Sequence, residues 1–182
     1  RIAAAGLAVA AVLAVIFFAV RTRQTTKIQP ANAAVTKRPN VRSSIAILGF
    51  KNLSSQREGD WLGVALVQML ATELQSGGSL RIVPDEVVTR AKGELGLKEK
   101  DGYPRDTLRA LRVNLASDYV VAGSYVALGN KESGQVRLDL RLQETISGET
   151  LASIAVSGKQ AEIFELVARA GQEMRSKVGG TI

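Results

Sequence analysis

Residues 2–20 form an apolar run, IAAAGLAVAAVLAVIFFAV, without a charge, a proline or a strongly polar side chain. As a helix rising about 1.5 Å per residue, this run would be about 28 Å long. That length is close to the hydrocarbon thickness of a bilayer, roughly 30 Å. A helix also satisfies its own backbone polar groups, as the bilayer core requires. The run therefore predicts a transmembrane helix over residues 1–21.

A secretory signal peptide is the alternative interpretation of this run. Its apolar region would span about 7–15 residues and end at small residues that a peptidase can cleave. Here the run is longer, ends on Phe17 and Phe18 shortly before Val20, and is followed at once by Arg21. These features favour a retained anchor. Because the sequence begins at Arg1 and not at methionine, we also expect it to be part of a longer chain.

Small residues recur every four positions within the run, at Gly6, Ala10 and Ala14. This spacing lets two transmembrane helices approach closely. It indicates a face through which two spans could form a homodimer. The alternative is that the abundance of alanine produces the spacing by chance.

The net charge of +7 is confined to the beginning of the chain. Residues 1–43 contain seven Lys and Arg and no acidic residue, whereas residues 44–182 contain 17 basic and 17 acidic ones. A neutral domain predicts no nucleic-acid partner. The basic residues after the run are suited to anionic membrane lipid. They also favour the cytoplasmic side, although Arg1 alone represents the opposite flank.

The absence of cysteine and histidine narrows the chemistry of the chain. It removes disulfides, thiol nucleophiles, imidazole bases and zinc sites with soft ligands. Carboxylates could still act as an acid–base pair, with Asp60, Asp85, Asp118 and Asp139 as the candidates. Their positions favour helix capping and solvation instead. We therefore expect no catalytic residue, no cofactor and no metal.

Residues 22–43 have the few large apolar residues and the prolines of an extended linker. Residues 44–179 are long enough for one hydrophobic core. Apolar spacing in this domain predicts the order β-α-β-α-α-β-β-β-α. The expected strands are 44–50, 80–83, 119–128, 135–144 and 151–156. The expected helices run from Asp60 to the Gly77-Gly78 pair and over 84–95, 105–115 and 161–178.

This order favours an α/β (α+β) domain whose mixed sheet has helices packed on one side. Within 135–144, four apolar residues alternate with charged ones, which predicts one packed and one solvated face. Gly123, inside another expected strand, indicates a bulge or a close approach of two backbones more than a phosphate loop.

Three blocks of sequence carry a family resemblance. They are SIAILGFKNLS at 44–54 with Asp60-Trp61-Leu62, ASDYVVAGSY at 116–125, and TISGET at 145–150. Together they resemble the TolB amino-terminal-like domain over nearly all of 44–182, with Gly49 where the family usually has proline. The resemblance implies a module that follows a membrane span in bacterial receptor-like serine/threonine kinases. It also occurs in membrane-anchored winged-helix regulators, commonly before tetratricopeptide repeats.

From this resemblance we expect a non-catalytic sensing or protein-interaction domain of a transmembrane serine/threonine protein kinase, placed outside the cytoplasm. The alternatives are a free-standing anchored envelope scaffold, binding through its sheet edge, and the membrane-distal part of a winged-helix transcriptional regulator. Asn52, Ser54 and Trp61 are the candidate partner-binding residues, because open α/β sheets bind ligands beyond the carboxyl ends of their strands. For Trp61, burial in the core is the simpler expectation.

Overall fold

The structure is a computed structural model that describes residues 42–54, 60–129 and 134–179. The expected span with Gly6, Ala10 and Ala14, and nearly all of the expected linker, lie outside these residues. In the part that is described, every helix is too short or too polar to cross a membrane.

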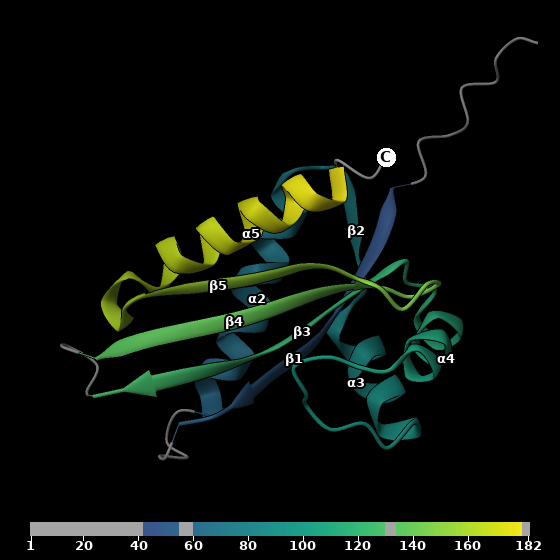
Figure 1. The fold of residues 1–182 in the computed structure, drawn as a ribbon, viewed down its shortest axis with the longest axis horizontal. Helices are drawn as coiled ribbons and strands as arrows, with labels where there is room; N and C mark the ends of the chain where they lie inside the picture. Colours follow the sequence, from purple (N-terminus) through teal and green to yellow (C-terminus); the bar gives the residue numbers. More distant parts are fainter. Residues whose placement is uncertain (1–41, 55–59, 130–133, 180–182) are drawn as a thin grey trace, which may run out of the picture. The chain divides into compact units, whose positions relative to one another are not determined.

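The elements follow the predicted order, and their bounds are close to the predicted ones (Figure 1). The strands are β1 (Ser43–Asn52), β2 (Leu80–Ile82), β3 (Tyr119–Leu128), β4 (Gln135–Glu144) and β5 (Thr150–Lys159). The helices are α2 (Asp60–Ser76), α3 (Asp85–Glu94), α4 (Arg105–Leu115) and α5 (Ile163–Gly179), the last preceded by a short 3-10 turn, η2 (Gln160–Glu162). The largest difference is β5, which extends three residues beyond the predicted end.

The five strands form one mixed sheet in the order β2-β1-β3-β4-β5. β1 is parallel to both β2 and β3, whereas β3, β4 and β5 are joined antiparallel. β2 is short and pairs with β1 only from Ser43 to Ile45. The remainder of β1 therefore has no described strand beside it on that side.

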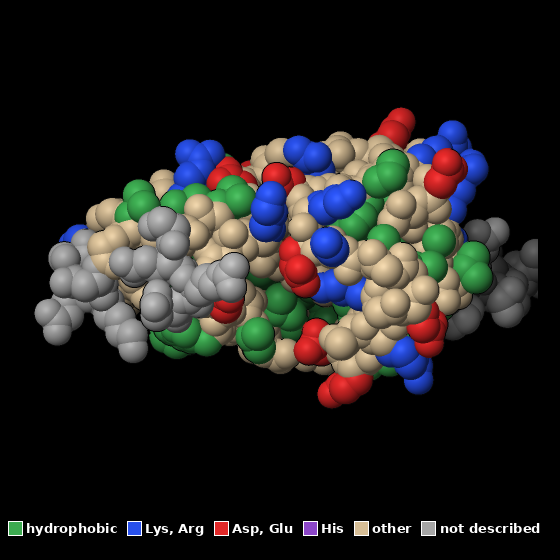
Figure 2. All heavy atoms as spheres, turned by 90° about the horizontal axis from the view of Figure 1, so that it is seen from below, with side chains coloured by type: hydrophobic (Ala, Val, Ile, Leu, Met, Phe, Trp, Pro, Cys, Tyr) green, Lys and Arg blue, Asp and Glu red, His purple; other side chains and the backbone are tan. Residues whose placement is uncertain are grey.

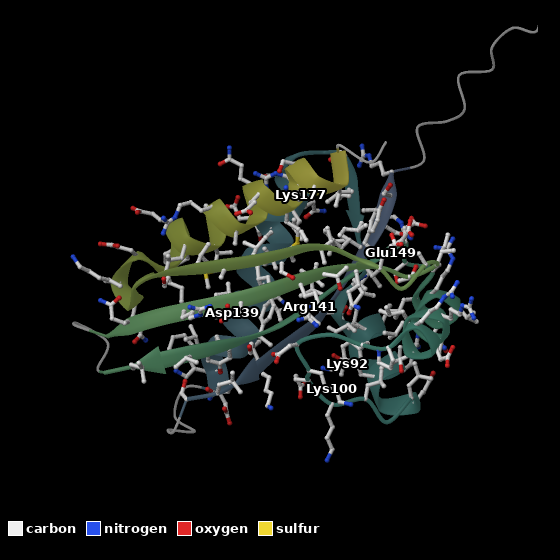
Figure 3. All side chains as sticks on the ribbon, viewed as in Figure 1. Lys92, Lys100, Asp139, Arg141, Glu149 and Lys177 are labelled. Carbon is white, nitrogen blue, oxygen red and sulfur yellow. The ribbon has the colours of Figure 1, made fainter. Side chains whose placement is uncertain are left out.

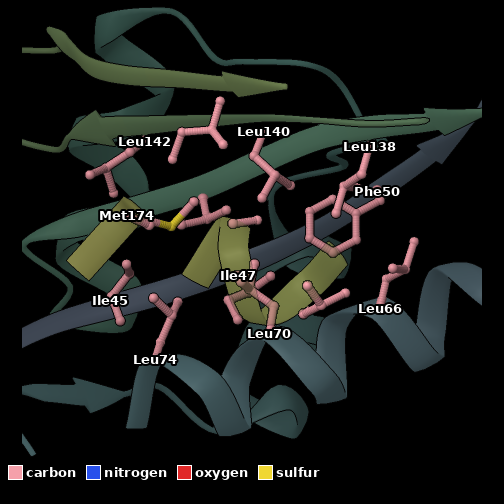
Figure 4. Packing of buried hydrophobic residues seen from close by; sticks show 14 of the residues in the cluster. Ile45, Ile47, Phe50, Leu66, Leu70, Leu74, Leu138, Leu140, Leu142 and Met174 are labelled. Atoms are coloured by element: carbon pink, nitrogen blue, oxygen red, sulfur yellow. The ribbon is translucent and has the colours of Figure 1, made fainter. Parts of the chain in front are cut away.

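The larger core lies on the face of the sheet that α2 and α5 cover (Figure 4). Leu62, Leu66, Leu70 and Leu74 form the buried stripe of α2, as their helical spacing predicts. They pack with alternate residues of the strands and with one side of α5, represented by Met174.

The expectation that all helices pack on one side of the sheet is wrong. A second core lies on the opposite face, where α3 and α4 cover β1 and β3. Leu48 of β1 and Ala122 of β3 point into it beside Leu108 and Leu111 of α4. The physical reason is that β1 and β3 are apolar on both faces, as expected of strands buried on both sides.

Two glycines are required by the backbone of the sheet. Gly49 has φ +100° at an irregularity in β1, between Ile47 and Phe50. The extra residue lets Ile47 and Phe50, three positions apart, face the same core. At Gly123, an added Cβ would lie 2.1 Å from the carbonyl oxygen of Asp139. This confirms Gly123 as a point of close backbone approach.

Candidate functional site: the cleft beside β1

A cleft of about 630 Å³ lies beside the second half of β1. It exists because β2 ends at Ile82 and Pro84 directs the chain into α3, leaving the sheet position next to β1 open. The walls are α2 on one side and α3 with the following loop on the other. Figure 2 shows hydrophobic side chains in a hollow on this side, flanked by charged ones. The charged side chains that line the cleft are Lys51, Asp60, Asp85, Lys92, Lys98 and Glu99.

The predicted residues Asn52 and Ser54 connect the end of β1 to its neighbours. The side-chain amide of Asn52 donates to Asp60 Oδ1 at 2.8 Å, and its oxygen accepts the backbone N–H of Ser54 at 2.9 Å. Ser54 Oγ in turn accepts the backbone N–H of Ala127 at 2.8 Å. These bonds hold together the ends of β1, α2 and β3, so both residues have a positioning role at the rim of the cleft.

Asp60 was predicted to cap α2 from just outside the helix. In the structure it is the first residue of the helix. A carboxylate in the first turn still interacts favourably with the helix dipole.

Trp61 is 54% exposed, so the expectation that it is buried in the core is wrong. It lies outside the leucine stripe of α2, which explains why the core does not cover it. Val64, one turn further along α2, is 64% exposed, and Leu53 after β1 is 47% exposed. We name Leu53, Trp61 and Val64 the apolar rim. Val64 lines the cleft, whereas Leu53 and Trp61 each directly follow a lining residue, Asn52 and Asp60. Exposed apolar residues next to a cleft are typical of a binding surface.

On the other wall, Lys92 of α3 joins the helix to the sheet and to the loop (labelled in Figure 3). Its ammonium donates to the Leu48 carbonyl oxygen at 2.8 Å and to Glu99 Oε1 at 2.6 Å. The hydrogen bond from Lys92 lowers the pKa of Glu99, and the positive charge of Lys92 acts in the same direction. Glu99 is therefore ionised at neutral pH.

The structure does not bring all four candidate carboxylates to one place. Asp60 and Asp85 both line the cleft, whereas Asp118 and Asp139 lie elsewhere. Asp118 accepts hydrogen bonds from Ser44 and Arg112; burial raises its pKa, but these bonds outweigh burial and lower it. The hydrogen bond from Arg137 lowers the pKa of Asp139. Among the described residues, acidic side chains nowhere form a group of three that could hold a metal ion.

Sequence reasoning missed Leu53, Val64 and the Lys92–Glu99 pair. Val64 could have been found, because it follows Trp61 at a spacing of three on the side of α2 away from the leucine stripe. Lys92 and Glu99 are separated by the end of α3 and the turn at Gly96, so no periodicity connects them.

The fold is similar to that of solved bacterial domains. The C-terminal domain of LpoB from Salmonella enterica matches with a TM-score of 0.51 and 21% sequence identity, over 65% of this chain and 84% of that domain. Lipoprotein GNA1162 from Neisseria meningitidis matches with a TM-score of 0.49 and 18% identity, over 72% of this chain and 96% of that protein. No protein-family model and no curated protein sequence matches the chain. The likeness to LpoB concerns the fold alone.

The expected membership of the TolB amino-terminal-like domain is wrong. The fold matches the LpoB C-terminal domain from Salmonella enterica with a TM-score of 0.51. TolB from Acinetobacter baumannii matches with a TM-score of only 0.40 and 11% identity, over 27% of that protein. The expected associations with a receptor-like kinase and with tetratricopeptide repeats rested on that resemblance, so they are wrong as well. The winged-helix alternative loses the same support.

Proposed function

We propose that this chain is a non-catalytic protein-interaction module of the bacterial envelope, which binds a protein partner at the cleft beside β1. In this proposal residues 2–20 anchor the chain, residues 22–43 form the linker, and the basic residues of that linker contact anionic lipid. Residues 44–179 form the binding domain.

The apolar rim is the observation that carries the proposal. Trp61 and Val64 are each more than half exposed on one helix, and Leu53 lies at the end of the strand that Asn52 ties to that helix. Tryptophan is enriched among the residues that dominate binding energy at protein interfaces. The cleft next to the rim is fixed by the Asn52 bonds and by the Lys92–Glu99 pair, so a partner would meet a preformed surface.

Photo-crosslinking in the native host tests the proposal. A benzophenone amino acid replaces Val64 in the full chain, and illumination is expected to give one discrete protein adduct. The same replacement at Val113, which is 84% exposed on α4, is the control for mere exposure. We expect no adduct at position 113.

The adduct at position 64 is expected to disappear when Trp61→Ser is introduced. Circular dichroism melting checks that this variant still folds. Identical adducts at positions 64 and 113, or no adduct at 64, would contradict the proposed site.

A further inference from the structure

With α5 packed against it, β5 forms one edge of the sheet. It pairs with β4 along one side, and no described strand pairs with it on the other. From Thr150 to Gly158 it carries no charged residue and no proline. Such an edge is a template for pairing with another strand, and proteins that keep an edge unpaired usually place charges on it.

In this sheet the charged residues lie on the inner strand and not on the edge strand. β4, the inner strand, carries Arg137, Asp139 and Arg141 on the face opposite α5, and Figure 3 shows the last two of these. Their partners on the edge strand are uncharged, exposed and small: Ser157, Ala155 and Ser153.

The other edge of the sheet has a different composition. β2 has only three residues and includes the exposed Arg81, and Lys92 bonds to the backbone of β1. β5 is thus the edge whose composition fits a partner strand, and its residues identify that partner as a second copy.

The sequence of β5 is nearly symmetric about Ala155. Reading outward from Ala155, Ile154 matches Val156 and Ser153 matches Ser157. One step further, Ala152 matches Gly158. When a strand pairs antiparallel with its own copy about a two-fold axis, residues equally distant from the centre lie opposite each other. Centred on Ala155, such pairing sets small residues against small ones and branched aliphatic residues against each other.

The backbone is oriented for this register. Gln160, just after β5, donates its N–H toward β4, to the carbonyl oxygen of Gly134 at 2.8 Å. Backbone groups alternate between the two sides of a strand. The backbone N–H and C=O groups that point to the open edge are therefore those of Ser153, Ala155 and Ser157. In the proposed register, Ala155 would form two backbone hydrogen bonds with Ala155 of the second copy.

We propose that two copies of this chain associate through β5, antiparallel and centred on Ala155, which joins their five-stranded sheets. This inference does not depend on the proposed partner at the cleft, because β5 lies at the other edge of the sheet. It also does not depend on contact between the N-terminal segments.

Cysteine crosslinking tests the register, since the chain has no cysteine of its own. In the proposed dimer the Cα atoms of Ala155 and its copy are about 5.5 Å apart, within the range that a disulfide bridges. Ala155→Cys in the full chain, in detergent with a mild oxidant, is expected to yield mostly disulfide-linked dimer. Ser157→Cys is the matched control on the same face, because its copy would lie about 14 Å away along the strands.

Ser157→Cys alone is expected to remain monomeric on a non-reducing gel, whereas co-expression with a tagged Ser153→Cys chain is expected to give the mixed dimer. Equal crosslinking at 155 and 157, or none at 155 while its thiol still reacts with maleimide, would overturn the proposal. Ala155→Lys supplies a second measurement: like charges would face each other, so sedimentation equilibrium should show a dimer dissociation constant at least tenfold larger. An unchanged dimer in Ala155→Lys would also overturn it.

Discussion

Gln143 of β4 binds both backbone groups of Tyr103 with its one side-chain amide. Its Oε1 accepts the Tyr103 N–H at 2.8 Å, and its Nε2 donates to the Tyr103 carbonyl oxygen at 3.1 Å. Gln143 is buried, and so is the Tyr103 side chain, whose hydroxyl donates to the Lys98 carbonyl oxygen at 2.7 Å. Burial raises the pKa of Tyr103 to about 12. These contacts fix the loop that carries Lys98 and Glu99 into the wall of the cleft.

Replacing Gln143 with alanine should therefore destabilise the domain. The substitution leaves a buried N–H and a buried carbonyl of Tyr103 without partners, at an expected total cost of about 2–3 kcal/mol. Chemical denaturation of the full chain in detergent measures the free energy of unfolding. Gln135→Ala, at the exposed start of the same strand, is the control and should change it by less than about 0.5 kcal/mol. Equal effects of the two substitutions would show that the Tyr103 bonds contribute nothing.

The Lys92–Glu99 pair predicts a pH dependence. The pKa of Glu99 is lower in the folded chain than in the unfolded one, so the pair stabilises the fold above the unfolded pKa. That contribution is lost as the pH falls through the folded pKa. Because the Glu99 side chain is 47% exposed, we expect a loss of only about 0.5 kcal/mol. The wild-type chain should therefore be more stable than Glu99→Gln at pH 6, and this difference should shrink as unfolding is measured at successively lower pH. A constant difference between the two would contradict the prediction.

Two glycine substitutions should have opposite effects. In Gly123→Ala, the added Cβ would overlap the backbone of Asp139 on the paired strand, so β3 and β4 must separate locally. We expect a loss of about 2–3 kcal/mol. In Gly93→Ala, the Cβ would meet no atom within 4 Å and the residue is helical, so the chain should gain up to about 1 kcal/mol. Thermal melting of both variants checks this difference, and a stable Gly123→Ala would mean that the strands are more loosely packed than described.

Periodicity was sufficient to predict the elements but not how the helices divide between the two faces of the sheet. The leucines of α2 recur at helical spacing and the apolar residues of β4 alternate, so each element could be derived from its own segment. Whether α4 covers the same face as α2 depends on which side of β1 needs covering. Ile47 is buried in the core beneath α2 and Leu48 in the core beneath α3 and α4, so both sides of β1 need covering. This is a property of the strand and not of either helix.

The candidate site was predicted only where it is local in sequence. Asn52 and Asp60 flank one short connection, and their hydrogen bond follows from the end of a strand meeting the start of a helix. Trp61 was placed correctly near this point but wrongly inside the core. Its position relative to the leucine stripe is readable from the sequence, whereas the emptiness of the neighbouring sheet position depends on where β2 ends.

Gly49 allows a final prediction about the floor of the cleft. With strict alternation, Ile47 and Phe50 would face opposite sides of β1, yet both are buried in the core beneath α2. The irregularity at Gly49, with φ +100°, supplies the extra residue. Alanine there should cost about 1–2 kcal/mol through its unfavourable φ. Proline, whose φ is held near −65°, cannot adopt this conformation and should cost more.

The order of stability in thermal melts should thus be wild type, then Gly49→Ala, then Gly49→Pro. The added Cβ of alanine would find its nearest neighbours, atoms of Glu99 and Lys92, at 3.5 Å, so steric overlap is not the cause. Gly96, which also has positive φ but no atom near its Cβ position, is the matched control. Gly96→Asn should be tolerated, because asparagine adopts left-handed conformations more readily than other residues. If Gly49→Pro melted with the wild-type chain, β1 would not need the extra residue, and Phe50 would reach the core by another route.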